Sequence, residues 1–245
     1  MSELDITKIP GIMRVHGWNN GAALMEKWFA GDANNSPVAG APSKDIIKMN
    51  WVLKYYRAKK IYDRIFSEKI WINDPAKLEI KRMLSKKQLF QDVKTSMPKL
   101  PVTHIDSYHI QHRKVGGTWE MITGPLDDLR ASLANFVFRV LVFGEIEPQK
   151  EKGCVVGHKF SIDEVGIYVR DSYDFNDMKG ADQELGYWDF EDNSVGKTFF
   201  SGGELIKNSH FRKWRRVNKK GGDFIVFSDI KYTKLKEKDV LIIKS

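Results

Sequence analysis

Cysteine is almost absent from this chain of 245 residues, since Cys154 is the only one. A single cysteine excludes an intramolecular disulfide and any zinc site built from several cysteines, so the chain suits a reducing compartment. The thiol stands in the apolar segment Gly153-Cys-Val-Val-Gly157. This context is typical of a structural cysteine rather than of a nucleophile.

Long apolar runs are also lacking. No stretch of about 18 apolar residues occurs, so the sequence predicts no membrane-spanning helix. The first residues, Met1-Ser-Glu-Leu-Asp-Ile-Thr-Lys8, include acids and no apolar segment, which argues against a secretory signal. We therefore expect a protein that is cytoplasmic in the cell that makes it, and whose export would use a route without a signal peptide.

Common catalytic motifs are missing as well. The sequence contains no phosphate-binding P-loop, dinucleotide fingerprint, calcium loop or Gly-x-Ser-x-Gly elbow. His104, His109 and His112 lie near Asp106, but their spacing matches no zinc motif. We interpret them as part of a polar loop.

Positive charge is what the chain has in excess, with 40 Lys/Arg against 32 Asp/Glu and a net charge of +8. Residues 1–100 hold 18 basic and 10 acidic residues, whereas residues 101–245 hold 22 of each. An excess of this kind favours contact with phosphates, an anionic membrane or an acidic protein. The alternative is a helix whose lysines are merely solvated.

Helical periodicity dominates the first hundred residues. Residues 21–29 are predicted as a short helix, and a third helix is expected from Asp74-Pro75 to Leu84 because Pro suits the first helical turn. Between them, apolar residues recur at spacings of four and three, which predicts one helix with Asn50 as its N-cap. The members of this stripe are Trp51, Tyr55, Ala58, Tyr62 and Ile65.

Strand patterns dominate after Pro101. Residues 135–143 form an apolar run, broken at Arg139, that predicts a central strand. Further strands are expected at residues 165–169, 222–228 and 240–243, with a weaker one at 197–201. The predicted fold class is α+β, an N-terminal helical part packed on a mostly antiparallel β-sheet or half-barrel. We expect a helical basic subdomain over residues 1–100 and a β-rich subdomain over 101–245 that carries the candidate site.

An acidic cluster follows the predicted strand at 165–169. Asp171, Tyr173 and Asp174 come at its end, where side chains are held rigidly enough to bind a cation or polarise a phosphate ester. Asp171 and Asp174 are the candidate ligands of a Mg²⁺ ion shared with a substrate phosphate. The alternative is local, because aspartates after strands often build turns by bonding their own backbone.

A basic segment forms the second candidate constellation. Residues 207–220 carry seven Lys/Arg and no acid. Trp214 with Arg212, Arg215 and Arg216 is the predicted substrate-binding group, since an aromatic ring and guanidinium groups suit an anionic lipid or a phosphate-bearing substrate. His210 is the histidine that we pair with the acidic cluster as a catalytic residue. A short basic helix with a buried Trp214 is the structural alternative.

Several motifs together resemble an uncharacterised bacterial domain-of-unknown-function family whose members are often encoded near type VI secretion genes. They span nearly the whole chain and are Leu24-Met25-x-x-Trp28-Phe29-Ala30-Gly31, Met49-x-Trp51-Val52-Leu53, Val165–Phe175, Leu185-Gly-Tyr-Trp188, Phe211-Arg-x-Trp214-Arg215 and Gly221-Gly-Asp-Phe224. The resemblance implies a genomic context and no particular reaction.

A narrower similarity links the acidic cluster to the catalytic domain of colicin-M-type bacteriocins, which cleave a lipid-linked peptidoglycan precursor. Asp171, Tyr173 and Asp174 match its Asp-x-Tyr-Asp motif one for one. The His-Arg pair that the motif then requires is replaced by Gly180-Ala181. The resemblance therefore implies that other residues, His210 with Arg212, would have to fold back onto the strand end.

Two functions follow as hypotheses. The first is an interbacterial toxin or effector linked to type VI secretion, a metal-assisted phosphodiesterase acting on a lipid-linked envelope precursor, with an immunity protein as a partner. The second is a non-enzymatic, secretion-associated adaptor or protein-binding module whose partner is a secretion-machinery component. We do not expect nucleic acid as the partner. The sequence leaves open whether the protein is an enzyme.

Overall fold

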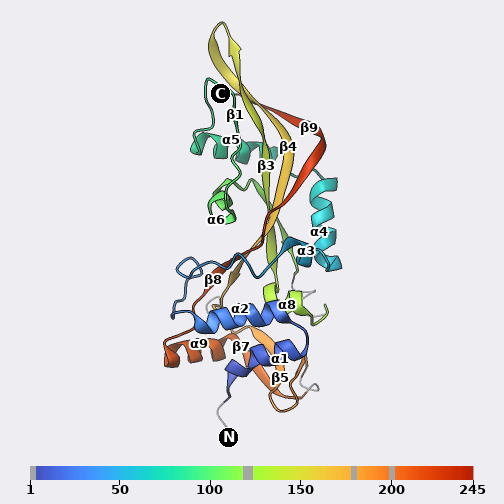
Figure 1. The fold of residues 1–245 in the computed structure, drawn as a ribbon, viewed down its shortest axis with the longest axis vertical. Coiled ribbons are helices and arrows are strands. Elements are labelled where there is room, and N and C mark those ends of the chain that lie inside the picture. Colours follow the sequence, from blue (N-terminus) through green and yellow to red (C-terminus); the bar gives the residue numbers. More distant parts are fainter. Residues whose placement is uncertain (1–3, 118–123, 178–180, 199–201, 245) are drawn as a thin grey trace. The chain divides into compact units, whose positions relative to one another are not determined.

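The computed structural model describes residues 4–117, 124–177, 181–198 and 202–244, and its fold is α+β as predicted (Figure 1). One sheet runs in the order β1 (Thr95–Ser96), β3 (Phe136–Glu151), β4 (Cys154–Tyr173) and β8 (Phe224–Phe227), with β2 (Gln111–Val115) on β3 and β9 (Lys231–Lys244) on β4. A second sheet runs in the order β6 (Ser194–Gly196), β5 (Glu184–Asp189) and β7 (Glu204–Lys207). The pairings β1–β3, β3–β4, β4–β9, β5–β6 and β5–β7 are antiparallel. Within the described residues, no helix has the length and apolar character needed to cross a membrane.

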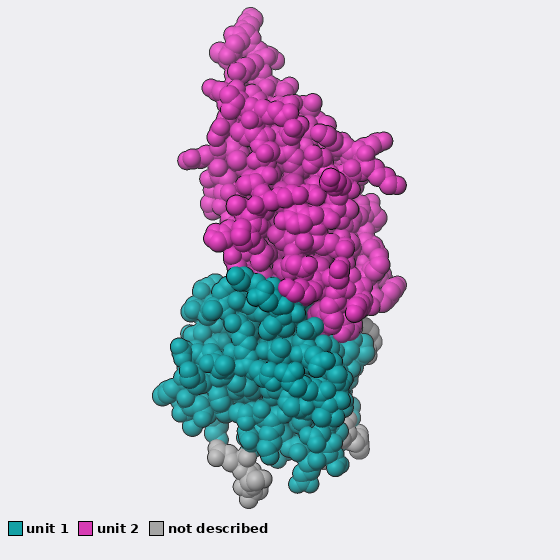
Figure 2. All heavy atoms as spheres, in the orientation of Figure 1, with its two compact units in different colours: residues 1–47, 116–136, 171–226 teal, residues 48–115, 137–170, 227–245 magenta. Residues whose placement is uncertain are grey.

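The chain divides into two compact units, each assembled from three separate stretches (Figure 2). Unit 1 comprises residues 1–47, 116–136 and 171–226, and unit 2 comprises residues 48–115, 137–170 and 227–245. These boundaries differ from the predicted division at residue 100. Local composition locates changes in charge and periodicity, whereas a compact unit is defined by contacts between distant segments.

Unit 1 combines helices with the small sheet. Its elements are η1 (Ile6–Lys8), α1 (Ile9–Val15), α2 (Asn19–Ala30), α8 (Asp128–Leu133), α9 (Asn208–Asn218), β5 (Glu184–Asp189), β6 (Ser194–Gly196) and β7 (Glu204–Lys207). The buried Asp128 carboxylate accepts hydrogen bonds from the backbone N–H of Gly21 at 2.8 Å and of Asn20 at 3.2 Å. An acid on α8 thus satisfies two amides in the first turn of α2, which would otherwise lack partners.

Unit 2 is organised around a long hairpin. β3 (Phe136–Glu151) pairs with β4 (Cys154–Tyr173), and β9 (Lys231–Lys244) pairs with the other side of β4. The remaining elements are α3 (Met49–Val52), α4 (Tyr56–Ser67), α5 (Asp74–Lys86), β1 (Thr95–Ser96), α6 (Val102–Ile105), η2 (Asp106–Tyr108) and β2 (Gln111–Val115). Tyr62 of α4 meets Phe138 of β3 edge to face at 6.1 Å, so the predicted aromatic stripe does enter the core.

The helix predicted from Asn50 to Ile65 is broken. α3 ends at Val52, and α4 begins at Tyr56 with Tyr55 as its N-cap residue. Asn50 lies inside α3, whose first amide, that of Met49, is bound by the Asp229 carboxylate at 2.6 Å. The prediction of one helix was wrong because the apolar spacing survives a short turn, and because the capping group comes from a distant residue.

Of the other predicted helices and strands, most are observed, and one is not observed at the residues that the structure describes. α5 is confirmed, with Asn73 accepting from the Ala76 N–H at 2.9 Å as its N-cap. The predicted strands at 165–169 and 240–243 lie within β4 and β9, the one at 135–143 lies within β3 from Phe136 onward, and the one at 222–228 corresponds to β8 (Phe224–Phe227). The weak strand at 197–201 is not observed at Lys197 and Thr198, which lie in a bend, and its other three residues lie outside the described residues.

Candidate functional site

The predicted acidic cluster lies in unit 1, at and just after the end of β4. The Asp174 carboxylate accepts a hydrogen bond from the backbone N–H of Asn176 at 3.0 Å, which is the local turn geometry considered from the sequence. The half-buried position of Asp174 raises the pKa of its carboxyl, with desolvation as the main cause and the charge of Asp223 as a smaller one. Asp171 lies partly exposed.

Tyr173 is packed into an aromatic cluster. Its ring stacks on Phe224 at 5.2 Å and meets Phe175 edge to face at 5.8 Å. Burial, together with the nearby charge of Asp171, raises the pKa of the Tyr173 phenol far above its ordinary value. Tyr173 is therefore neutral in the folded protein, and its side chain contributes packing area.

Arg212 on α9 binds the segment that follows the acidic cluster. Its Nη1 donates to the Phe175 carbonyl at 2.9 Å and to the Asp177 carboxylate, and its Nη2 donates to Asp182 at 3.1 Å. Asp177 also accepts from Asn208 Nδ2 at 2.7 Å. The guanidinium thus ties Phe175, Asp177 and Asp182 to α9.

Arg215 forms a buried ion pair with Asp223, whose side chain is fully buried. Asp223 also accepts from Trp28 Nε1 at 2.8 Å and from Asn176 Nδ2 at 2.7 Å. The Arg215 guanidinium lies over the Trp28 ring, 5.1 Å from its centroid. Three donors on one carboxylate compensate for the desolvation of this pair.

The other residues of the basic segment each make different contacts. His210 Nδ1 accepts from the Lys207 N–H at 3.0 Å, so this histidine caps the start of α9. The half-buried Trp214 packs edge to face on Phe29 at 4.8 Å, and Arg216 is exposed. Gly221 has a φ of 96°, and a Cβ there would lie 2.5 Å from the Trp28 ring, so both the backbone conformation and the close approach require glycine at this position.

The structure therefore joins Asp174 to Arg215 and Asp223 through Asn176, and it assigns folded-state contacts to Arg212 and His210. In the described part of the chain, no group of three or more His, Cys, Asp or Glu side chains is arranged to hold a metal ion. The catalytic roles of Asp171, Tyr173, Asp174 and His210, and the Mg²⁺ at Asp171 and Asp174, stay predictions.

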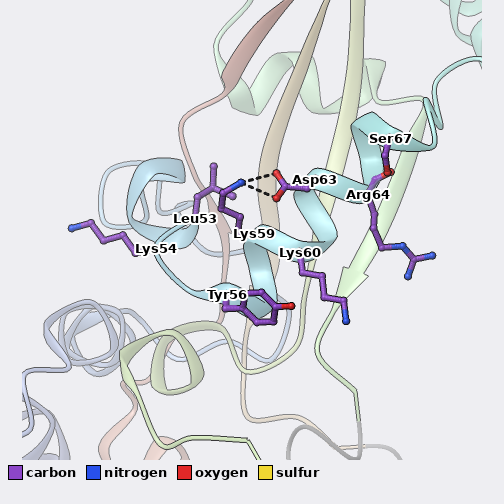
Figure 3. Close-up of a pocket in the computed structure, with 8 residues that line it drawn as sticks. All are labelled: Leu53, Lys54, Tyr56, Lys59, Lys60, Asp63, Arg64 and Ser67. Carbon is purple, nitrogen blue, oxygen red and sulfur yellow. Dashed lines mark hydrogen bonds and ion pairs between the residues drawn. The ribbon is translucent and has the colours of Figure 1, made fainter.

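A hollow on α4 of unit 2 is a site that sequence reasoning did not single out (Figure 3). It has a volume of about 570 Å³ and is lined by Leu53, Lys54, Tyr56, Lys59, Lys60, Asp63, Arg64 and Ser67. Tyr56, Lys60 and Arg64 follow at intervals of four, so they share one side of the helix. Tyr56 is 79% exposed, so its ring is open to a partner.

Charge is divided unequally between the units. Unit 2 contains 26 Lys/Arg and 14 Asp/Glu, a net charge of +12, whereas unit 1 contains 14 and 18, a net charge of −4. The excess noticed in residues 1–100 is therefore a property of unit 2. The charged residues can be counted in the sequence, but only the fold shows which segments belong to one unit and should be counted together.

Comparison with known proteins adds a family and no activity. A family model described as a family of unknown function, DUF6402, matches residues 4–200 and 194–243. No curated protein and no solved structure matches the chain. The description of the family names neither a reaction nor a secretion system.

Proposed function

The chain belongs to the DUF6402 family of unknown function, and from this premise we propose that it is a non-enzymatic binding module. In this proposal unit 2 recognises the acidic surface of another protein, and a secretion-machinery component is the partner that the sequence resemblance favours. The observation that carries the proposal is the separation of charge, +12 in unit 2 against −4 in unit 1. Such a field attracts an acidic partner over a distance of several ångströms.

The exposed side of α4 is the contact surface that this proposal uses. Tyr56 supplies an exposed aromatic ring, a residue type that is enriched at protein interfaces. Lys60 and Arg64 extend on the same side of the helix (Figure 3). An aromatic ring beside cationic groups suits the acidic surface of a folded protein.

Acids interleaved with the basic residues favour a protein over a polyphosphate backbone. Lys59 pairs with Asp63 at 2.7 Å, and Arg64 pairs with Glu68 at 2.8 Å. A stripe that tracks nucleic-acid phosphates gains affinity from uninterrupted positive charge, because each neutralised phosphate releases counterions. Alternating signs instead allow complementary pairing with a partner that carries both charges.

The test is a comparison of two double charge reversals. We expect Lys54→Glu with Lys60→Glu to raise the Kd for a fluorescent acidic peptide about tenfold, since exposed ion pairs contribute up to about 1 kcal/mol each. Lys152→Glu with Lys236→Glu is the matched control, because it makes the same change in net charge at exposed positions that do not line the hollow. Fluorescence anisotropy measures both.

Two results would contradict the proposal. One is equal weakening by both double variants, which would mean that only net charge matters. The other is tighter binding to a DNA duplex or to anionic vesicles than to the acidic peptide, with a salt dependence steep enough to indicate counterion release.

The antibacterial effector is a second candidate, and the raised pKa of the half-buried Asp174 favours it, because perturbed carboxyls gather at active sites. In this candidate Asp171 and Asp174 would hold Mg²⁺ or activate water, with Tyr173 positioning an envelope lipid precursor. Arg212 and Arg215 would neutralise its phosphates. An immunity protein would protect the producing cell.

Expression in a sensitive bacterium separates the two candidates. The effector should kill only when it is directed to the periplasm, and Asp174→Ala should abolish killing while leaving the thermal unfolding midpoint unchanged. Absence of killing by the wild-type protein in both compartments removes this candidate and leaves the binding module intact.

A further inference from the structure

Asp106, in η2 of unit 2, is the shared partner of three side chains from the β3–β4 hairpin. Its Oδ1 accepts from Arg139 Nη1 at 2.6 Å and from the Tyr168 hydroxyl at 2.5 Å. Its Oδ2 lies 3.5 Å from Arg170 Nε. Arg139 and Tyr168 are partners across the two strands, and Arg170 lies two residues further along β4, so all three project from one face of the sheet.

The charges in this cluster do not balance. Two guanidinium groups share the single carboxylate of Asp106, although the Arg139 and Arg170 side chains are only 18% and 25% exposed. Burial lowers the pKa of the neighbouring His109, whose Nδ1 lies 2.7 Å from the Asp106 carbonyl and 3.4 Å from Arg139 Nη1. His109 is therefore neutral near pH 7 and leaves the excess of positive charge unchanged.

Two hydrogen-bond donors in this cluster also lack acceptors in the part of the chain that the structure describes. The Nε atoms of Arg139 and Arg170 are buried and have no hydrogen-bond partner among the described residues. A buried donor without a partner and a partly buried charge without a counter-ion both cost free energy. Asp106 carries one negative charge for two guanidinium groups: its Oδ1 receives donors from Arg139 and Tyr168, and its Oδ2 lies within ion-pair distance of Arg170 Nε without a hydrogen bond between them.

We propose that Arg139 and Arg170 form a binding site for a small oxyanion, either a carboxylate or a phosphate group. A guanidinium presents donors in a planar fork that matches two oxygens of such a group. Asp106 acts as a positioning residue that holds Arg139, while the bound anion supplies the second negative charge. The site is separate from the α4 hollow and does not depend on the proposed protein partner.

Calorimetric titration with inorganic phosphate and, separately, with acetate tests the proposal at constant ionic strength. We expect saturable binding by the wild-type protein and an increase in Kd of at least tenfold in Arg170→Gln. Arg113→Gln is the matched control, because it removes an arginine of β2 that pairs with Glu68 and makes the same change in charge. The tighter of the two anions identifies the ligand as a phosphate or a carboxylate.

A second measurement keeps the proposal testable if Arg170→Gln fails to fold. In the wild-type protein, the NMR signals of arginine Nε–H groups that are protected from exchange should shift saturably with phosphate or acetate. Chloride at equal ionic strength should leave them in place. The proposal is overturned if neither anion binds saturably, or if Arg170→Gln and Arg113→Gln bind with the same Kd.

Discussion

At the residue scale, unit 1 depends on a polar contact at the centre of an aromatic cluster. Asp223 is fully buried and receives donors from Trp28, Asn176 and Arg215. Phe175 and Phe211 stack at 3.8 Å beside the Trp28 ring, so apolar side chains enclose the ion pair between Arg215 and Asp223. Buried ion pairs of this kind add little net stability when intact, but losing one partner is costly.

Asp223→Asn should lower the free energy of unfolding by about 3 kcal/mol, because it leaves the Arg215 charge buried without a counter-ion. Urea-induced unfolding followed by tryptophan fluorescence measures the change. Asp32→Asn is the control, since Asp32 pairs with Lys220 on the surface, and it should leave the urea midpoint where it was. Equal urea midpoints for the two variants would contradict the expectation that breaking the buried pair costs more stability than breaking the surface pair.

His109 makes stability depend on pH. Burial lowers its pKa below 6.5, so the unfolded chain binds a proton more readily than the folded protein does. The stability that the neutral imidazole contributes is therefore complete above about pH 6.5 and is lost as the pH falls below that value. His109→Asn should make the urea midpoint less sensitive to acidification, whereas replacing the exposed His104 by Asn should not. An unchanged pH profile in His109→Asn would contradict this linkage.

At the element scale, caps decide where the helices of unit 2 begin. Asn73 caps α5 with its own side chain, whereas α3 is capped from Asp229, far along the chain. The sequence predicts the first kind because the residue adjoins the helix. The second kind is invisible to it, which is why Asn50 was assigned a capping role that the structure gives to another residue.

Asn73→Ala should destabilise the protein by about 1 kcal/mol, the usual effect of losing a side-chain cap. Asn50→Ala should change the free energy of unfolding by less than about 0.5 kcal/mol, since the Asn50 side chain is exposed and accepts a hydrogen bond from Lys231 at the surface. Urea titration of both variants provides the comparison. A larger loss of stability in Asn50→Ala than in Asn73→Ala would contradict the break between α3 and α4.

Edge protection is a second element-scale property. The first half of β9 alternates exposed and less exposed residues, and its exposed positions include Lys234, Lys236 and Lys238. Lysines on a strand of this kind discourage pairing with another chain. Because they also dilute the apolar pattern, the sequence predicted only residues 240–243 of this strand.

At the scale of the whole molecule, each unit is built from distant stretches of chain. Trp28 and Asp223, which bond to one another, are 195 positions apart, and Gly21 and Asp128 are 107 apart. Charge follows the same division, since unit 2 is strongly basic and unit 1 mildly acidic. A cut at residue 100 would therefore divide both units.

Fragments 1–100 and 101–245, expressed separately, should lack a cooperative thermal transition by circular dichroism. The first would contain α2 without Asp128 and without Asp223, and the second would contain β3, β4 and β9 without α4 and α5. The intact chain, measured in the same buffer, is the control. A sharp transition in the fragment 1–100 alone would restore the predicted division.

The sequence by itself determined the α+β class, the helix from Asp74 and the apolar strand around residues 135–143, because periodicity and N-terminal caps are local properties. It also offered a local turn at Asp174 as one of two alternatives, and the hydrogen bond from the Asn176 N–H has that turn geometry. Only the tertiary structure decided that Arg215 lies against Asp223, that Arg139 meets Asp106, and that the positive charge gathers in unit 2. The reason is physical: a buried ion selects its partner by proximity in space, and that proximity is created by packing segments that are far apart in the chain.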